Sequence, residues 1–408
     1  MRRIDPGSFV RATRSTPRDI NRRILLNLVR EHQPVSRADL ARMMKIGRGR
    51  VTELVTDLVK EGELEVGATT SLPRGRRPEM LSVRTGDRLV MAVDVRFSRT
   101  FLMLSDFSGA AKAVDSFETV MDPPALISAI GKCARELLKK HDRKKHCEGI
   151  GLVVPGMVDQ KTGRVINSPQ LGWKDVEVRD ALSRAMHLPV EIENAPIACA
   201  LAQMWLGERG VKVPQNFVYV TVSDGVGAGI VVNGELVRGD SNTAGEFGHM
   251  PIEIGDGSAT CLCGAKGCLE TRTSNIATLS RYLGVPFSPE TARDLLMTSG
   301  VTISDVVARA TGGDERAVES LRETGRYLGA GIATIVNALN PATIFIGGEV
   351  MGAWDIIGPE IRAAIASRAL SPNAAATRIV IDPTDTYPRL RGATALVAAK
   401  GFAAPRVA

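Results

Sequence analysis

The chain contains little cysteine and no long apolar segment, and each absence excludes a class of protein. Only 6 of its 408 residues are cysteine, and Cys133, Cys147 and Cys199 are too scattered for the disulfide framework of a secreted domain. No uninterrupted apolar stretch reaches the roughly 18 residues that a membrane-spanning helix needs. The basic N-terminal segment lacks an apolar core behind it, so we expect no secretion signal. These absences favour a cytoplasmic protein without a membrane partner, in which clustered thiols bind metal rather than oxidise.

The excess of positive charge is confined to the first fifth of the chain. Residues 1–88 contain 19 Lys and Arg against 11 Asp and Glu, a net charge of +8, whereas the remaining 33 Lys and Arg and 34 Asp and Glu give −1. This distribution is typical of a small module that binds a polyanion, attached to a neutral body. Charge alone favours such a module and a solvated basic face equally. The length of the chain also predicts two or three domains.

Periodic apolar residues predict three short helices before residue 63. Ser36 is the expected N-cap of the second helix, with Asp39 three positions on, and Gly62 is expected to end the third. A break at "GRG" (47–49) separates the last two helices, which makes them a helix-turn-helix. The positions expected to face the core are Ile20, Ile24, Leu25, Leu28, Leu40, Met43, Met44, Val51, Leu54, Val55 and Leu58.

A hairpin with an arginine-rich tip follows these helices. Residues 63–83 predict two short strands, and the tip "PRGRRP" between them is held extended by Pro73 and Pro78. Arginines of this kind suit a narrow minor groove, and the start of a recognition helix is where such proteins contact base edges. We therefore predict a winged helix-turn-helix over residues 18–85 that binds double-stranded DNA, rather than a small packing domain. The expected DNA contacts are Arg48, Arg50, Thr52 and Glu53 on the helix and Arg74, Arg76 and Arg77 on the wing.

Beyond residue 88, β-rich stretches alternate with helices. Three consecutive strands, a buried strand and a strand-helix pair are followed by a second round, which has a glycine-rich turn at 223–229. Two rounds of this pattern predict an α/β body with the two-lobed actin-like fold of sugar kinases, which is also RNase H-like. We expect the first lobe over residues 88–198 and the second over 199–388. Residues 389–408 should form a helix that returns to the first lobe, with a tail, and residues 1–17 a flexible end.

The cysteine-rich segment carries the most specific motif. His249 in "GEFGHM" precedes Cys261, Cys263 and Cys268 in "CLCGAKGCLE", a His-x11-Cys-x-Cys-x4-Cys spacing. Three thiolates and one imidazole complete a tetrahedral zinc shell, which favours a structural Zn²⁺ over a catalytic one because no position is left for water. The segment resembles the signature of the ROK family, which comprises repressors, open reading frames and sugar kinases. With the winged helix in front, the chain is similar to the repressor branch, which includes xylose and N-acetylglucosamine repressors.

The resemblance implies a sugar pocket beside the zinc. By position, Asn194, Glu246, His249 and Glu270 would form hydrogen bonds with sugar hydroxyl groups. One ring nitrogen of His249 would bind zinc and the other would face the sugar.

The resemblance also argues against an enzyme. Kinases of the family carry Asp after the residue that matches Asn194, whereas this chain has Ala195, whose methyl group cannot accept a proton. Their Gly-Gly-Thr phosphate turn is replaced here by Val95-Arg96-Phe97-Ser98 after Asp94. We therefore expect no catalytic residues and no phosphoryl transfer.

Together these features predict a homodimeric transcriptional regulator, a repressor of sugar-uptake or catabolic genes. A sugar or sugar phosphate would release it from a pseudo-palindromic DNA operator by binding the DNA-incompetent state better. A dimer of dimers remains an alternative assembly, and an activator would differ only in which state the sugar favours. Two other functions stay open: a sugar kinase with an appended DNA-binding domain, and a ligand-independent DNA-binding protein.

Overall fold

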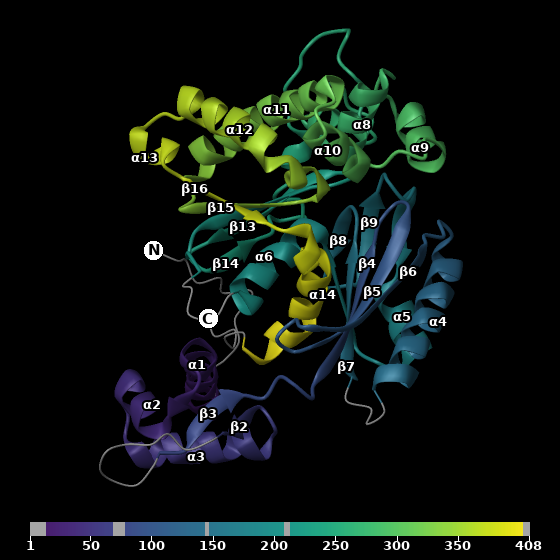
Figure 1. Cartoon of the computed structure of the whole chain (residues 1–408). Helices are drawn as coiled ribbons and strands as arrows, with labels where there is room; N and C mark the ends of the chain where they lie inside the picture. Colours follow the sequence, from purple (N-terminus) through teal and green to yellow (C-terminus); the bar gives the residue numbers. More distant parts are fainter. Residues whose placement is uncertain (1–13, 68–77, 143–146, 208–212, 403–408) are drawn as a thin grey trace.

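A computed structural model describes residues 14–67, 78–142, 147–207 and 213–402. Within these ranges the chain forms a small N-terminal winged domain beside a larger two-lobed body (Figure 1). In this part of the chain, the helices are all too short or too polar to cross a membrane.

The winged domain contains three helices and a three-stranded antiparallel sheet of order β1-β3-β2. Ser36 caps the second helix as predicted, because its Oγ accepts the backbone N–H of Asp39. The two-residue strand β1 is too short for alternation to reveal it in the sequence. The elements are α1 (Thr16–His32), β1 (Val35–Ser36), α2 (Arg37–Met44), α3 (Arg48–Lys60), β2 (Leu64–Val66) and β3 (Met80–Val83).

Three details of the winged domain differ from expectation. The helix α3 begins at Arg48 rather than after the "GRG" break, because Gly47 adopts the extended N-cap conformation. Ile24 and Met43 are exposed, since the buried stripe of α1 is Leu25, Leu26 and Val29 and that of α2 is Leu40 and Ala41. The flexible end expected at residues 1–17 includes Thr16 and Pro17, which form the first turn of α1.

The two lobes are built on five-stranded sheets of the same topology, which confirms the predicted two-lobed α/β fold. In each sheet three antiparallel strands are followed by two parallel ones. The first sheet contains β4 (Leu89–Val95), β5 (Arg99–Asp106), β6 (Ala111–Glu118), β7 (Cys147–Val154) and β11 (Val190–Asn194). The second contains β12 (Phe217–Val222), β13 (Val226–Val232), β14 (Glu235–Val237), β15 (Thr343–Gly347) and β16 (Arg378–Asp382). A small third sheet joins β8 (Met157–Asp159), β9 (Arg164–Ser168) and β10 (Trp173–Glu177).

Two helices lie between the five-stranded sheets. The helix α14 (Pro388–Ala398) packs on β4 and β7, α6 (Ala195–Leu206) packs on β12 and β13, and the two helices pack on each other (Figure 1). The expected lobe boundary at residues 198–199 therefore falls inside α6, which runs without a break. Small side chains such as Ala195, Ala198 and Ala393 fill this central layer.

The remaining helices cover the outer faces of the sheets (Figure 1). On the first sheet they are α4 (Pro123–His141) and α5 (Arg179–Met186). On the second they include α8 (Asn275–Leu283), α10 (Ile303–Thr311), α11 (Glu315–Leu339) and α12 (Trp354–Arg368). The shorter elements are η1 (Phe247–His249), α7 (Glu270–Thr273), α9 (Pro289–Thr298), η2 (Glu349–Ala353), α13 (Pro372–Ala375), η3 (Thr384–Thr386) and η4 (Ala399–Gly401).

The C-terminal segment reaches the winged domain. Phe402, which was expected in the tail, is buried and packs with the hydrophobic core of the three N-terminal helices. The winged domain is therefore attached to the body by packing as well as by the linker before β4.

Candidate metal centre and ligand pocket

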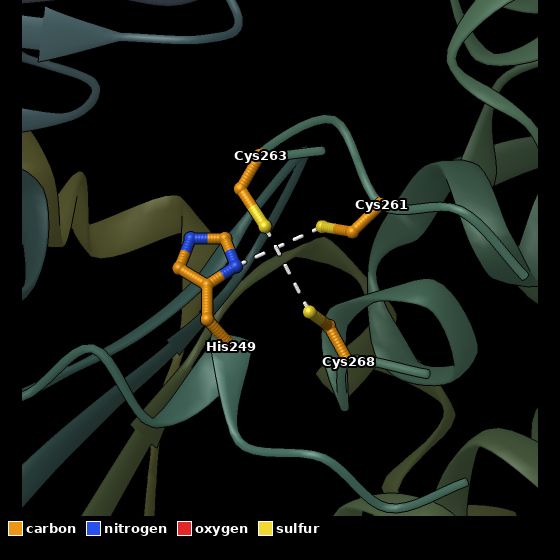
Figure 2. Close-up of side chains that lie close together, drawn as sticks. All are labelled: His249, Cys261, Cys263 and Cys268. Carbon is orange, nitrogen blue, oxygen red and sulfur yellow. Dashed lines mark hydrogen bonds between the residues drawn. The ribbon is translucent and has the colours of Figure 1, made fainter. Parts of the chain in front are cut away.

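His249, Cys261, Cys263 and Cys268 point into one common space (Figure 2). Their ligand atoms all lie within 4.8 Å of one another. The Cys263 and Cys268 sulfurs are 3.8 Å apart, and Nδ1 of His249 is 3.7 Å from the Cys261 sulfur. A tetrahedral site with metal–sulfur bonds of about 2.3 Å has ligand–ligand edges of about 3.8 Å. The four residues therefore fit a metal ion, whereas the sulfurs are too far apart for a disulfide.

A small hairpin positions the cysteines. Thr260 pairs with Lys266, and the N–H of Cys261 donates to the carbonyl of Ala265 at 2.8 Å. Gly267 has φ +72°, and a Cβ there would lie 2.0 Å from the carbonyl oxygen of Glu253, so only glycine fits this turn. The sequence thus brings the three thiols together through local turn geometry.

A pocket between the lobes adjoins the metal cluster. All four residues expected to bind sugar line it, as does Cys263. They come from four places: the end of β11, the residue before η1, η1 itself and the start of α7. The predicted residues lining the pocket are Asn194, Glu246, His249 and Glu270.

Glu246 and Glu270, the two carboxylates among these four residues, are in low-polarity surroundings. Burial raises the pKa of Glu246 above its ordinary value and raises that of Glu270 to about 7. Glu270 Oε2 accepts the N–H of Val226 at 2.8 Å. His249 Nε2 lies 3.7 Å from Glu246 Oε2, on the side of the ring away from the cysteines, and burial lowers the pKa of His249.

The helix α6 begins in the pocket. Asn194 caps it, with Oδ1 accepting the N–H of Ile197 at 3.1 Å, so the side-chain NH₂ is the group left to face a ligand. Ala195, the first residue of the helix, is buried and lines the pocket. The glycine-rich turn packs against this end of α6, since a Cβ at Gly227 would be 2.7 Å from Cγ of Pro196. A Cβ at Gly225 would be 2.5 Å from Nε2 of Gln170 and 2.9 Å from Glu270 Oε2.

Arg96 and Arg389 also line the pocket and belong to an ion-pair cluster. Arg96 donates from Nε to Asp94 Oδ2 at 2.7 Å and from Nη1 to Glu349 Oε1 at 2.5 Å. Arg389 Nη2 lies 2.7 Å from Asp94 Oδ1. Asp94 lies in β4 of the first sheet, and Glu349 begins η2, which follows β15 of the second sheet. Arg96 therefore joins the two lobes.

The charges of this cluster are strongly coupled. Asp94 and Glu349 raise the pKa of Arg96 against the opposing effect of burial. Burial, reinforced by Glu349, raises the pKa of Asp224 to about 6. Sequence reasoning noticed Arg96 only as a bulky residue in a degraded phosphate turn, and it missed Gln170, Asp224, Glu349 and Arg389. Only the tertiary structure brings these residues to the pocket, since Arg96 and Glu349, for example, lie 253 positions apart in the sequence.

Comparison with known proteins identifies the family to which this architecture belongs. The model of the ROK family matches residues 91–400, which is well over half of the chain. The chain belongs to the ROK family. A solved ROK family transcriptional regulator, described as a homologue of the E. coli Mlc protein, superposes with a TM-score of 0.76 at 24% identity. The match covers 95% of this chain and 98% of that one, so the ROK regulator fold extends over the winged domain as well as the body.

The proteins similar to this chain include both repressors and sugar kinases. A xylose repressor of Caldicellulosiruptor bescii is 28% identical over 357 residues, covering 86% of this chain and 88% of that protein. A glucokinase of Halalkalibacterium halodurans is 35% identical over 281 residues, covering 66% of this chain and 83% of that protein. The kinase match covers less of this chain than the regulator match, which extends over the winged domain as well as the body.

In this ROK chain the residues expected to contact DNA are partly described. Arg48, Arg50, Thr52 and Glu53 are all exposed in the first turns of α3. Arg50 and Glu53 pair on the helix surface at 3.0 Å, and Thr52 donates to the carbonyl of Arg48 at 2.9 Å. The wing residues Arg74, Arg76 and Arg77 lie outside the described residues. Lys45, exposed in the turn before α3, was not singled out from the sequence.

Proposed function

We propose that the chain is a sugar-responsive DNA-binding repressor of sugar-uptake or catabolic genes. One observation carries the proposal: a single chain combines an exposed recognition helix with a pocket in which two carboxylates, an amide and an imidazole converge. The named activity of the xylose repressor among its relatives supports the same combination. A homodimer would place two winged domains in successive major grooves of a pseudo-palindromic operator.

The pocket chemistry favours a sugar as effector. Glu246 and Glu270 would accept hydrogen bonds from hydroxyl groups, the NH₂ of Asn194 would donate one, and Nε2 of His249 would complete the set. A structural Zn²⁺ held by His249, Cys261, Cys263 and Cys268 would fix the tautomer and the orientation of the His249 ring. The ion would thereby hold one wall of the pocket in shape.

We further propose that the chain has no kinase activity. Ala195 stands in the pocket at the start of α6, where the kinases of the family would carry the proton-accepting Asp. Arg96, which pairs with Asp94 and Glu349, also lines the pocket.

The test measures the two halves of the function on the full-length, zinc-loaded protein. Thermal shifts are recorded with D-xylose, D-glucose, N-acetyl-D-glucosamine, glucose 6-phosphate and N-acetylglucosamine 6-phosphate. A ligand at about 100 times its Kd should stabilise the fold by about 2.7 kcal/mol, a shift of several degrees. DNA affinity is then measured by fluorescence anisotropy, with and without the best sugar, on a duplex that the protein selects from a random pool.

We expect the active sugar to weaken DNA binding. The double variant Arg48→Ala, Arg50→Ala should lose affinity for the duplex and keep the sugar-induced shift, because both side chains are exposed and far from the pocket. A flat sugar screen with intact DNA binding would instead support the ligand-independent DNA-binding function. A sugar that strengthens DNA binding would overturn the proposal that the sugar releases the chain from its operator.

A further inference from the structure

Two helices begin at the ligand pocket and run toward the winged domain. The helix α6 starts at Ala195 in the pocket, and the carbonyls of Met204 and Trp205 at its other end contact α1. The helix α14 has Arg389 in the pocket at its second position, and the segment that follows it, up to Phe402, also contacts α1. The 12 residues of α6 span about 18 Å, so this helix connects the two sites directly. The helix α14 packs beside it (Figure 1).

The two helices are packed as one unit. A Cβ at Gly392 of α14 would lie 2.6 Å from the backbone carbon of Ala198 in α6, so the backbones are in close contact. Arg391 of α14 donates a hydrogen bond to the carbonyl of Leu206 at the C-terminal end of α6. Since close-packed interiors transmit displacements rather than absorb them, one helix cannot slide without moving the other.

One face of α1 contacts both the end of α6 and the segment that follows α14. Arg23, Asn27 and Arg30 follow one another at intervals of four and three residues, which places them on the same side of the helix. Arg23 donates to the carbonyls of Lys400 and Gly401 at 2.9 and 3.0 Å, and Asn27 donates to that of Phe402 at 2.9 Å.

Arg30 is the centre of this contact. Its Nη1 donates to the carbonyls of Met204 and Trp205 at 3.3 and 3.2 Å, at the end of α6 where the helix dipole favours a cation. Its guanidinium carbon lies 4.8 Å from the Trp205 ring and 5.4 Å from the Phe402 ring, and the two rings stack with centroids 6.1 Å apart. The cation thus contacts α6, the segment after α14 and the winged domain together.

We propose that the contact formed by Arg30, Trp205 and Phe402 transmits the state of the ligand pocket to the winged domain. A ligand that moves the pocket ends of α6 and α14 displaces their far ends as a rigid pair, and Arg30 converts that displacement into a change in the position of α1. The inference rests on the proposed function, because it concerns how the effector alters DNA affinity. It predicts that this contact sets the coupling between the two sites more than the affinity of either.

The experiment compares coupling factors, defined as the ratio of DNA Kd values with and without sugar. The probes are the selected duplex and whichever sugar of the screen gives the largest thermal shift. Coupling factors of roughly 5–150 are usual for allosteric proteins. We expect Trp205→Ala and Arg30→Lys to bring the factor to within about twofold of 1, because lysine keeps the charge but lacks the planar group that stacks and bridges two carbonyls. Arg362→Ala is the matched control, since Arg362 lies over Trp354 at 5.2 Å in the second lobe and should leave the factor unchanged.

The outcomes separate this inference from the proposed function. Unchanged coupling in both variants would overturn the inference and leave the repressor function standing. A chain without any sugar effect on DNA affinity, before any substitution, would overturn both. If Trp205→Ala fails to fold, Arg30→Lys decides the matter by its coupling factor alone.

Discussion

The two walls of the ligand pocket are held together by different forces. On one wall, His249 and three cysteines from the second lobe converge on a space that fits a metal ion. On the other, Arg96 joins Asp94 of the first lobe to Glu349 of the second. One wall is therefore fixed within a lobe and the other is fixed across the lobes.

This difference indicates which contacts a change in lobe angle can alter. Rotation of one lobe against the other leaves the four metal ligands in place, because they move together. The same rotation must stretch the contact between Arg96 and Glu349, which Asn275 reinforces by donating to Glu349 Oε2 at 2.8 Å. The metal wall thus preserves the shape of the site, while the ion-pair wall opposes its opening.

Breaking the metal wall should have the largest effect. In Cys263→Ser the zinc content should fall well below one ion per chain, because a neutral hydroxyl is a poor replacement for a thiolate ligand. Loss of the ion should lower the free energy of unfolding, because the binding free energy of a structural metal contributes to folding. Zinc is measured by mass spectrometry of the purified protein, and stability by chemical denaturation.

Cys133→Ser is the matched control for this substitution. Cys133 is half-buried in α4 and is not among the four clustered ligands, so its variant should retain zinc and unfold as the unmodified chain does. Full zinc occupancy in Cys263→Ser would refute the four-ligand set.

Breaking the ion-pair wall should have a smaller effect. Arg96→Ala leaves the fully buried Asp94 with Arg389 alone and removes the cation beside Glu349, which should cost roughly 3 kcal/mol. Arg326→Ala, an arginine that also has two carboxylate partners but is half-exposed, should cost less than about 1 kcal/mol. Equal losses in the two variants, measured by chemical denaturation, would show that Arg96 is an ordinary surface ion pair.

The same contrast explains what the sequence could and could not predict. The helix-turn-helix and the convergence of His249 with the cysteines follow from spacings within about twenty residues, which local turns determine. The Arg96–Glu349 pair and the contact of Phe402 with α1 join residues hundreds of positions apart, so no local sequence pattern predicts them. Ile24 and Met43 were assigned to the core because an apolar stripe read from spacing alone has an uncertain rotation about the helix axis. The roles proposed for Asn194, Glu246 and Glu270 rest on family resemblance, since isolated polar residues at the ends of strands and helices have no diagnostic spacing.

The smallest effect is expected from Ala195→Asp, which restores a carboxylate at the start of α6. If the Arg96 ion pairs occupy the position where kinases of the family bind phosphate, a carboxylate at 195 alone should not create kinase activity. ADP release from ATP should then stay at background with D-glucose and D-xylose. The reason is that Arg96 still occupies the turn after Asp94 and still pairs with both of its carboxylate partners. The glucokinase of Halalkalibacterium halodurans, assayed in parallel, provides the positive control. The double variant Ala195→Asp, Arg96→Gly then tests whether removal of Arg96 allows the new carboxylate to support ADP release. Sugar-dependent ADP release by the unmodified chain would show that it is a kinase with a DNA-binding domain, and release by the single variant would show that the ion-pair wall is no barrier to phosphoryl transfer.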